Sequence, residues 1–135
     1  MQNRRNFLKA SLATSAGVVA ATVLPASAAE DSKENIFAYT QEHQGRWEGK
    51  AGSHAPIITI EGNKVTLETK HVMTDAHYIV KHSLRDGNGN VLGEQVFFPQ
   101  DKKAISTYVI EGNYKELYAM SFCNIHDLWV TKFSK

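Results

Sequence analysis

Residues 78–98 read YIVKHSLRDGNGNVLGEQVFF, and they place a tight turn between two runs of β-forming residues. The turn is Asp86-Gly87-Asn88-Gly89-Asn90, in which glycine and asparagine tolerate the positive φ angles that short hairpin connections require. One β-type run extends from Tyr78 to Leu84, and the other extends from Val91 to Phe98. We therefore expect an antiparallel hairpin in the middle of the chain.

The same alternation of short β-type runs and turns continues on both sides of this hairpin. Further strands are predicted at 57–60, 64–68, 104–110, 114–122 and 128–133. Turn residues separate them, as at Gly62-Asn63 and Gly112-Asn113. About seven short strands in roughly 80 residues are typical of an all-β sandwich of immunoglobulin-like type. We expect one such domain, spanning residues 30–135.

A short N-terminal helix is predicted ahead of the first strand. Asp31 and Glu34, three residues apart, resemble a capping box, and the helix would end near Gly45. Its apolar face would consist of Ile36, Phe37 and Tyr39.

Residues 1–29 have the order of a secretory signal peptide. The paired Arg4-Arg5 is followed by Phe7-Leu8-Lys9, an apolar run from Ala10 to Leu24, and small residues from Ala26 to Ala29. The twin arginine favours the Tat route. A transmembrane anchor is the alternative, but the apolar run is shorter than the ~20 residues that a spanning helix needs. We expect cleavage, a periplasmic location and no membrane attachment afterwards.

The charge of the expected mature domain excludes polyanionic partners. Removing residues 1–29 takes three of the 15 basic residues and none of the 14 acidic ones, so 12 basic residues face 14 acidic ones and the net charge is −2. The basic residues are scattered and do not interleave with aromatic residues along one face. We expect no nucleic-acid binding.

Cys123 and His126, separated by two residues in a polar turn, are the first candidates for a metal site. Cys123 is the only cysteine, so the chain can form no internal disulfide. His54, His71 and His77 also lie at expected strand ends or in connecting loops. Loops at one end of a sandwich can converge. One thiolate and four imidazoles are therefore available for a mononuclear metal site.

Three segments together resemble the superoxide reductases, also called neelaredoxins or desulfoferrodoxins. The segments are Ser53–Ile57, the histidine pair His71 and His77 with five residues between, and Leu117–His126 followed by Leu128-Trp129. The similarity extends roughly from Gly52 to Lys135 and fills all five ligand positions.

The resemblance implies iron with four equatorial imidazoles and an axial Cys123 thiolate. It also implies an open sixth position where superoxide binds ferrous iron and is reduced to hydrogen peroxide. An external electron donor, rubredoxin-like or a cytochrome, would restore the ferrous state, and a homo-oligomer is plausible for the family.

The chain departs from the family pattern just before the first ligand. Superoxide reductases usually carry a glutamate and a lysine there, where this chain has Gly52 and Ser53. The nearest substitutes are Glu48 and Lys50, six and four residues before His54. A bulged, glycine-containing loop could return Lys50 to the site. Alternatively, both are surface charges, and steering falls to the metal and Lys70.

Two other departures lie beside the ligands. Val72-Met73 replaces the family's Pro-Asn after the second ligand, and Asp127 replaces a glycine after the last histidine. A carboxylate near the thiolate is expected to disfavour electron density there. Of the remaining residues, His43 and His82 fit no part of the pattern and are expected at the surface or in the core. Trp129 is expected to pack near the site, and Tyr118 and Phe122 in the sandwich core.

Other metals and other functions stay open at this point. Zinc prefers four ligands, whereas copper with histidines, one cysteine and Met120 or Met73 would make a cupredoxin-like electron carrier. However, no methionine follows His126, as it does in cupredoxins. The alternatives to an enzyme are a non-catalytic iron- or copper-binding electron-transfer module and an accessory protein with a degenerate site.

Overall fold

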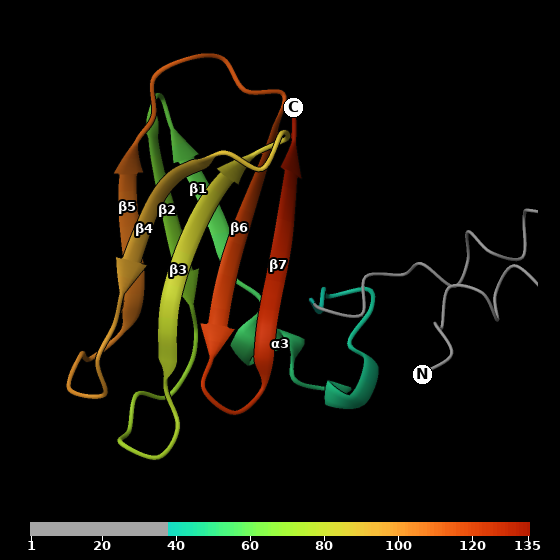
Figure 1. Cartoon of the computed structure of the whole chain (residues 1–135), viewed down its shortest axis with the longest axis vertical. Helices are drawn as coiled ribbons and strands as arrows, with labels where there is room; N and C mark the ends of the chain where they lie inside the picture. Colours follow the sequence, from blue (N-terminus) through green and yellow to red (C-terminus); the bar gives the residue numbers. More distant parts are fainter. Residues whose placement is uncertain (1–37) are drawn as a thin grey trace, which may run out of the picture. The chain divides into compact units, whose positions relative to one another are not determined.

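A computed structural model of the chain describes residues 38–135 (Figure 1). The predicted signal peptide and the predicted capping box at Asp31 and Glu34 lie outside these residues. The seven strands are β1 Ile57–Glu61, β2 Lys64–Thr69, β3 Ile79–Asp86, β4 Val91–Val96, β5 Ala104–Val109, β6 Glu116–Cys123 and β7 Asp127–Ser134. Each corresponds to a predicted strand, with ends that differ by one or two residues. Among residues 38–135, no helix is long and apolar enough to cross a membrane.

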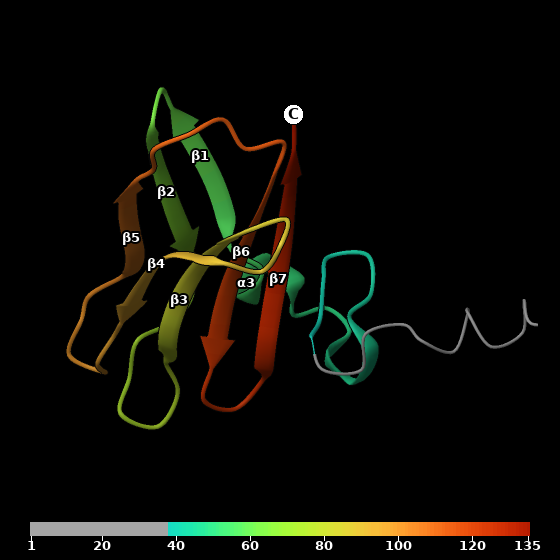
Figure 2. The same cartoon turned by 45° about the horizontal axis from the view of Figure 1, so that its top comes forward.

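The strands form two antiparallel sheets, so the predicted β-sandwich is confirmed. One sheet has the order β1-β2-β5, and the other has the order β4-β3-β6-β7. Figure 2 shows the two sheets as separate layers. In the predicted hairpin, β3 pairs with β4, and Asp86 Oδ1 accepts hydrogen bonds from the backbone N–H groups of both Asn88 and Asn90. These bonds hold the tight turn that the Gly- and Asn-rich sequence predicts.

The core lies between the sheets and is built from alternating residues of each strand. Val65 and Leu67 of β2 pack against residues of the facing sheet, namely Leu84, Leu117 and Ala119. On β6 the buried residues alternate with half-buried or exposed ones, as expected for a strand with one face covered. This burial stabilises the sandwich in proportion to the apolar area removed from water.

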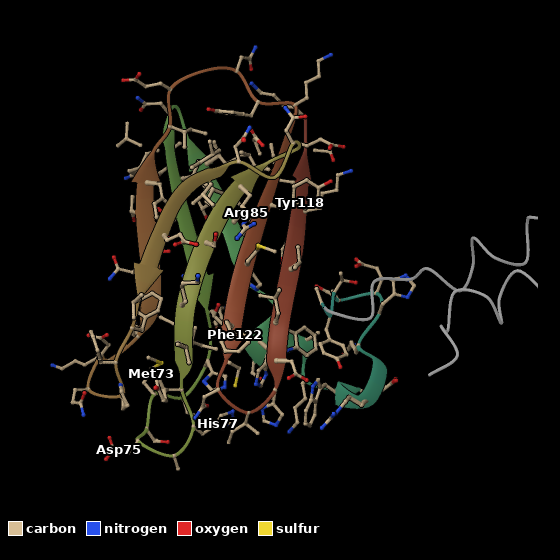
Figure 3. All side chains as sticks on the ribbon, viewed as in Figure 1. Met73, Asp75, His77, Arg85, Tyr118 and Phe122 are labelled. Atoms are coloured by element: carbon tan, nitrogen blue, oxygen red, sulfur yellow. The ribbon has the colours of Figure 1, made fainter. Side chains whose placement is uncertain are left out.

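The predicted core positions Tyr118 and Phe122 lie on the other face of β6. Phe122 is 42% exposed and Tyr118 is half-buried, and both are on the outer face of the four-stranded sheet (Figure 3). The prediction for Phe122 was therefore wrong. Both alternating sets of β6 are largely apolar, so hydrophobicity did not distinguish the inner face from the outer one.

A short N-terminal helix is present, but it lies after the predicted one, of which the described residues 38–44 are not helical. Tyr39 forms an isolated β-bridge with Trp129, so no helix continues through this residue. The helical segments among residues 38–135 are η2, a 3-10 turn at Gly45–Trp47, and α3 at Ala51–His54. The α3 segment leads directly into β1 and carries the first predicted ligand, His54.

Candidate metal centre

All five predicted ligands come together at one end of the sandwich. His54 ends α3, His71 and His77 belong to the β2–β3 loop, Cys123 ends β6, and His126 lies in the β6–β7 turn. Figure 3 shows His77 at this end of the molecule. The ligand atoms of these five residues, called the ligand cluster below, all lie within 4.8 Å of one another. The predicted convergence of three separate segments is therefore present.

The four imidazole nitrogens form a closed ring. His54 Nε2 lies 3.0 Å from His126 Nδ1, which lies 3.0 Å from His77 Nε2. His71 Nε2 closes the ring, at 3.0 Å from His77 Nε2 and 3.1 Å from His54 Nε2. Ring centroids of neighbours are 4.3–4.8 Å apart, whereas those of the opposite pair, His54 and His77, are 5.9 Å apart. The four sides of the ring are nearly equal, as the sides of a square would be.

This square has the dimensions that a metal ion requires. The centre of a square with such sides lies about 2.1 Å from each corner, which is an ordinary metal–imidazole bond length. A tetrahedral ion at that bond length would hold its nitrogens about 3.4 Å apart, which is farther than the 3.0–3.1 Å between neighbours in the ring. Four ring nitrogens that converge on one point make poor hydrogen-bond partners for one another, but they suit a cation.

The sulfur completes the set from the protein interior. Cys123 Sγ lies 3.7 Å from both His71 Nε2 and His126 Nδ1, and the residue is 1% exposed. His71, His77 and His126 are half-buried. One anionic thiolate beside four neutral nitrogens is a donor set that suits iron or copper.

Backbone carbonyls fix two of the imidazoles. His54 Nδ1 lies 3.0 Å from the Lys50 carbonyl and 2.8 Å from Ser53 Oγ, and His71 Nδ1 bonds to the carbonyl of Val72. Because a carbonyl only accepts, both Nδ1 atoms carry the proton, and both Nε2 lone pairs point into the ligand cluster. Such outer bonds orient metal-binding histidines.

Burial and nearby positive charge favour the neutral, metal-binding form of three of the imidazoles, those of His54, His71 and His126. Burial is the main reason why the pKa of His54 falls to about 4, and the nearby His71 adds to this effect. The pKa of His71 is also lowered, mainly by burial. For His126, burial again lowers the pKa, followed by His77 and the positive charge of Lys50. A neutral imidazole offers its lone pair at neutral pH.

Lys50 and Glu48 are both exposed, in the segment that joins η2 to α3. Lys50 affects two of the ligands. Its backbone carbonyl orients His54, and its positive charge lowers the pKa of His126. Among residues 38–135, no described hydrogen bond or ion pair joins Glu48 to the ligand cluster. The catalytic roles of these two residues stay predictions. Gly49, between them, has φ +83°, which supplies the bend that the predicted bulged loop requires.

The two histidines outside the ligand cluster lie in different environments, the surface and the core, both of which the sequence allowed. His43 is exposed, whereas His82 is fully buried in the core. Trp129 packs near the site as predicted, because its ring centroid lies 5.7 Å from that of His54 and its indole N–H donates to the His126 carbonyl.

Sequence analysis missed Trp47. Its indole Nε1 donates to Asp127 Oδ2 at 2.8 Å, and its ring lies edge-to-face against His126 at 4.5 Å. The two bonded residues are 80 positions apart, and no motif links them. The Asp127 carboxylate, expected to act on the thiolate, is thus engaged by an N–H donor.

Comparison with known proteins agrees with this site. The family model described as desulfoferrodoxin matches residues 44–132, which include the whole ligand cluster. Superoxide reductase (neelaredoxin) from Ignicoccus hospitalis is 25% identical, with a TM-score of 0.60 over 73% of this chain and 93% of that chain. Superoxide reductase (1Fe-SOR) from Giardia intestinalis is 26% identical, with a TM-score of 0.56 over 62% of this chain and 98% of that chain.

A search of curated proteins found no match. The family model nevertheless covers well over half of the chain, and the four-histidine, one-cysteine cluster lies within the matched residues. The chain therefore belongs to the desulfoferrodoxin family.

Proposed function

We propose that this protein is a periplasmic superoxide reductase that converts superoxide to hydrogen peroxide at a mononuclear iron centre. The closed square of four imidazole nitrogens with one buried thiolate beside it is the observation that carries the proposal. Similarity to proteins named superoxide reductases supports the reaction class.

Bound iron would supply the single electron that, with two protons from solvent, turns superoxide into hydrogen peroxide. Cys123 provides a buried anionic sulfur, which raises electron density at the centre. Two of the four histidines, His54 and His71, are held in position by hydrogen bonds from Nδ1 to backbone carbonyls. Because the sulfur is buried and three imidazoles are half-buried, a small anion would approach from the side opposite Cys123.

Lys50 is proposed to attract the anionic substrate in place of the lysine that the family usually carries next to the first ligand. Its charge acts on the His126 side of the ligand cluster, and its exposed side chain can face an incoming anion. Glu48 remains the candidate for the family's glutamate. An external one-electron donor, rubredoxin-like or a cytochrome, would complete the cycle, and self-association is proposed by analogy with the family.

An electron-transfer module is the second candidate function. A square of nitrogens also suits Cu(II), and the chain has Gly52 and Ser53 where the family usually carries glutamate and lysine. Such a module would bind the metal and change its oxidation state, but it would not consume superoxide catalytically.

One experiment separates these two functions. Residues 30–135 are loaded anaerobically with Fe(II), and metal content, visible spectrum and superoxide consumption with a reductant are measured. A superoxide reductase yields one peroxide per superoxide and releases no O2. Loaded protein that does not turn over superoxide would favour the module.

Replacing the sulfur ligand gives a specific prediction. Cys123→Ser is expected to abolish the thiolate-to-iron charge-transfer band of the oxidised protein and most of the activity, because a hydroxyl is a much weaker donor. His43→Ala, which changes an exposed histidine outside the ligand cluster, serves as the control and is expected to retain both properties. A Cys123→Ser protein with the parent spectrum would refute ligation by this sulfur.

Export by the Tat route is proposed from residues 1–29. Folding and metal acquisition before export would suit a site that needs a reduced thiol. In a bacterial host, the full chain is expected in the periplasmic fraction, and replacing Arg4 and Arg5 by lysine is expected to retain it in the cytoplasm. Periplasmic recovery of the double variant at the parent level would argue against this route.

A further inference from the structure

Both tryptophans of the chain direct their indole N–H groups to the same dipeptide, His126-Asp127. Trp129 Nε1 donates to the His126 carbonyl at 2.8 Å, and Trp47 Nε1 donates to Asp127 Oδ2 at 2.8 Å. Trp129 belongs to β7 and is fully buried, so its bond follows from the fold. Trp47 comes from η2, which is distant in sequence, and its side chain is only half-buried.

His126 needs an orienting contact that the other anchored imidazoles do not need. His54 and His71 use Nε2 toward the ligand cluster and fix Nδ1 on a backbone carbonyl. His126 instead presents Nδ1 to the cluster, and among residues 38–135 no hydrogen bond anchors its other ring nitrogen, Nε2. The Trp47 ring, at 4.5 Å and an interplanar angle of 89°, packs against the His126 ring and restricts its rotation.

The Trp47 side chain is held on a rigid turn. Its backbone N–H donates to the Gln44 carbonyl at 2.9 Å, and its carbonyl accepts from the Lys50 N–H at 3.0 Å. Gln44 Oε1 accepts from the N–H of Ala51, the first residue of α3. These bonds tie Trp47 to the helical segment that presents His54.

Asp127 supplies the other half of the contact. Its φ is +63°, a left-handed conformation that costs energy for residues with a side chain and is best tolerated by Asp and Asn. The hydrogen bond from Trp47 holds the carboxylate of this turn residue in one position. The last hairpin and the η2–α3 segment are thereby joined next to the ligand cluster.

We propose that Trp47 is a positioning residue for the metal centre: its ring sets the orientation of His126, and its N–H bond to Asp127 holds the turn that carries this ligand. The inference rests on the proposed metal centre, but not on the reaction performed there. Trp47 touches neither the ion nor the substrate in this role. Loss of the contact should therefore change metal retention and ligand geometry.

Cobalt(II) binding to residues 30–135 tests this role independently of superoxide chemistry. Trp47→Leu is expected to release Co(II) to a chelator about tenfold faster than the parent and to shift the visible Co(II) bands, because outer contacts of this kind typically change metal affinity by that order. Trp47→Phe keeps a ring and is expected to fall between parent and Trp47→Leu. Equal release rates and spectra for Trp47→Leu and parent would overturn the proposal.

Substitutions at Asp127 test the same contact from its other side. Asp127→Gly suits the positive φ and removes the side chain that accepts from Trp47, so faster Co(II) release is expected. Asp127→Asn keeps an acceptor oxygen for Trp47 and is expected to restore the parent rate. If Trp47→Leu fails to fold, as judged by circular dichroism of the metal-free protein, an unchanged rate in Asp127→Gly would itself overturn the proposal.

A remote control separates positioning from general destabilisation. Tyr118→Leu removes an aromatic side chain from the outer face of the four-stranded sheet, and it is expected to leave the Co(II) spectrum and release rate unchanged. Equal acceleration in Tyr118→Leu and Trp47→Leu would overturn the proposal. Failure of the parent protein to bind Co(II) at all would refute the metal centre itself and the positioning role with it.

Discussion

His82 is a buried histidine that serves the fold and not the metal site. Its Nε2 lies 2.8 Å from Thr69 Oγ1, and its Nδ1 lies 2.9 Å from Ser106 Oγ. Thr69 donates its own hydroxyl proton to Ser121 Oγ, so the Thr69 oxygen accepts from His82 Nε2–H. His82 is thus a neutral imidazole that accepts at Nδ1 from Ser106. Four side chains from both sheets satisfy one another in an otherwise apolar core.

This arrangement predicts an acid-sensitive fold. Burial lowers the pKa of His82 from 6.5 to about 4, so between these values the unfolded chain binds a proton that the folded chain does not. The free energy of unfolding should therefore fall as pH falls from 6.5 to 4, by about 3 kcal/mol from this residue. Denaturant unfolding of the metal-free protein at several pH values between 6.5 and 4 measures this change in the free energy of unfolding.

The contribution of His82 is isolated by comparison with a variant that cannot titrate at this position. His82→Gln is expected to show a shallower loss of stability with acid than the parent. Identical pH slopes in His82→Gln and parent would contradict the prediction.

Lys50 gives a prediction on the rate of substrate encounter. Lys50→Ala removes the charge beside His126 but keeps the backbone carbonyl that orients His54. Superoxide consumption by the iron-loaded protein should slow several-fold at low salt, and the difference should shrink near 0.5 M salt, because screening weakens steering. Lys135→Ala, at the C-terminus, is the control. A Lys50→Ala protein that matches the parent at every ionic strength would remove Lys50 from the steering role.

At the scale of elements, the close packing of β4 against β5 requires a residue without a side chain at position 93, which is Gly93. A Cβ added there would lie within 2.6 Å of Tyr108 Cε1 and 2.9 Å of Tyr108 Cγ. Gly93 belongs to β4 and Tyr108 to β5, which are in different sheets. The tyrosine ring therefore packs directly on the glycine backbone and covers the space between the sheets.

Gly93→Ala is accordingly expected to destabilise the domain. Overpacking of this kind typically costs 1–3 kcal/mol, so the free energy of unfolding should fall by about 2 kcal/mol. Gly52→Ala is the matched control, because a Cβ there meets no atom within 4 Å and alanine favours the helical conformation. Chemical denaturation of both variants checks the difference, and equal stabilities would show that the Tyr108 ring moves aside at no cost.

For the whole molecule, the ligand cluster joins three segments that the sheets alone do not hold together. The α3 segment, the β2–β3 loop and the β6–β7 turn each contribute at least one ligand. A metal that binds only the folded chain must stabilise it, by about 3 kcal/mol when the free metal exceeds its Kd a hundredfold. Metal binding is thus expected to add to a modest core.

Removal of the metal should therefore lower the Tm and loosen the β2–β3 loop. Thermal unfolding with and without a chelator measures the first effect, and hydrogen exchange of residues 71–77 measures the second. His77→Ala should show a smaller difference between loaded and metal-free protein than the parent does. An unchanged Tm after complete metal removal would mean that the metal does not bind the folded chain in preference to the unfolded one.

The strands could be predicted because their local signals agree. Lys64–Glu68 alternates polar and apolar residues, and the Gly- and Asn-rich turn at residues 86–90 permits one kind of connection. The α3 helix escaped prediction because four residues are too few for a helical period to emerge. Phe122 was misplaced because the two faces of β6 have similar hydrophobicity, and only the facing sheet selects between them.

From the chain alone, the residue types and spacings specify a β-sandwich with one sulfur and four imidazoles available for a metal. Turn and strand preferences act over a few residues, and the resemblance to the family supplies the ligand set. The square of nitrogens, the bond from Trp47 to Asp127 and the approach of Lys50 to His126 were decided by tertiary structure. These contacts join residues up to 80 positions apart, so they depend on how whole segments pack.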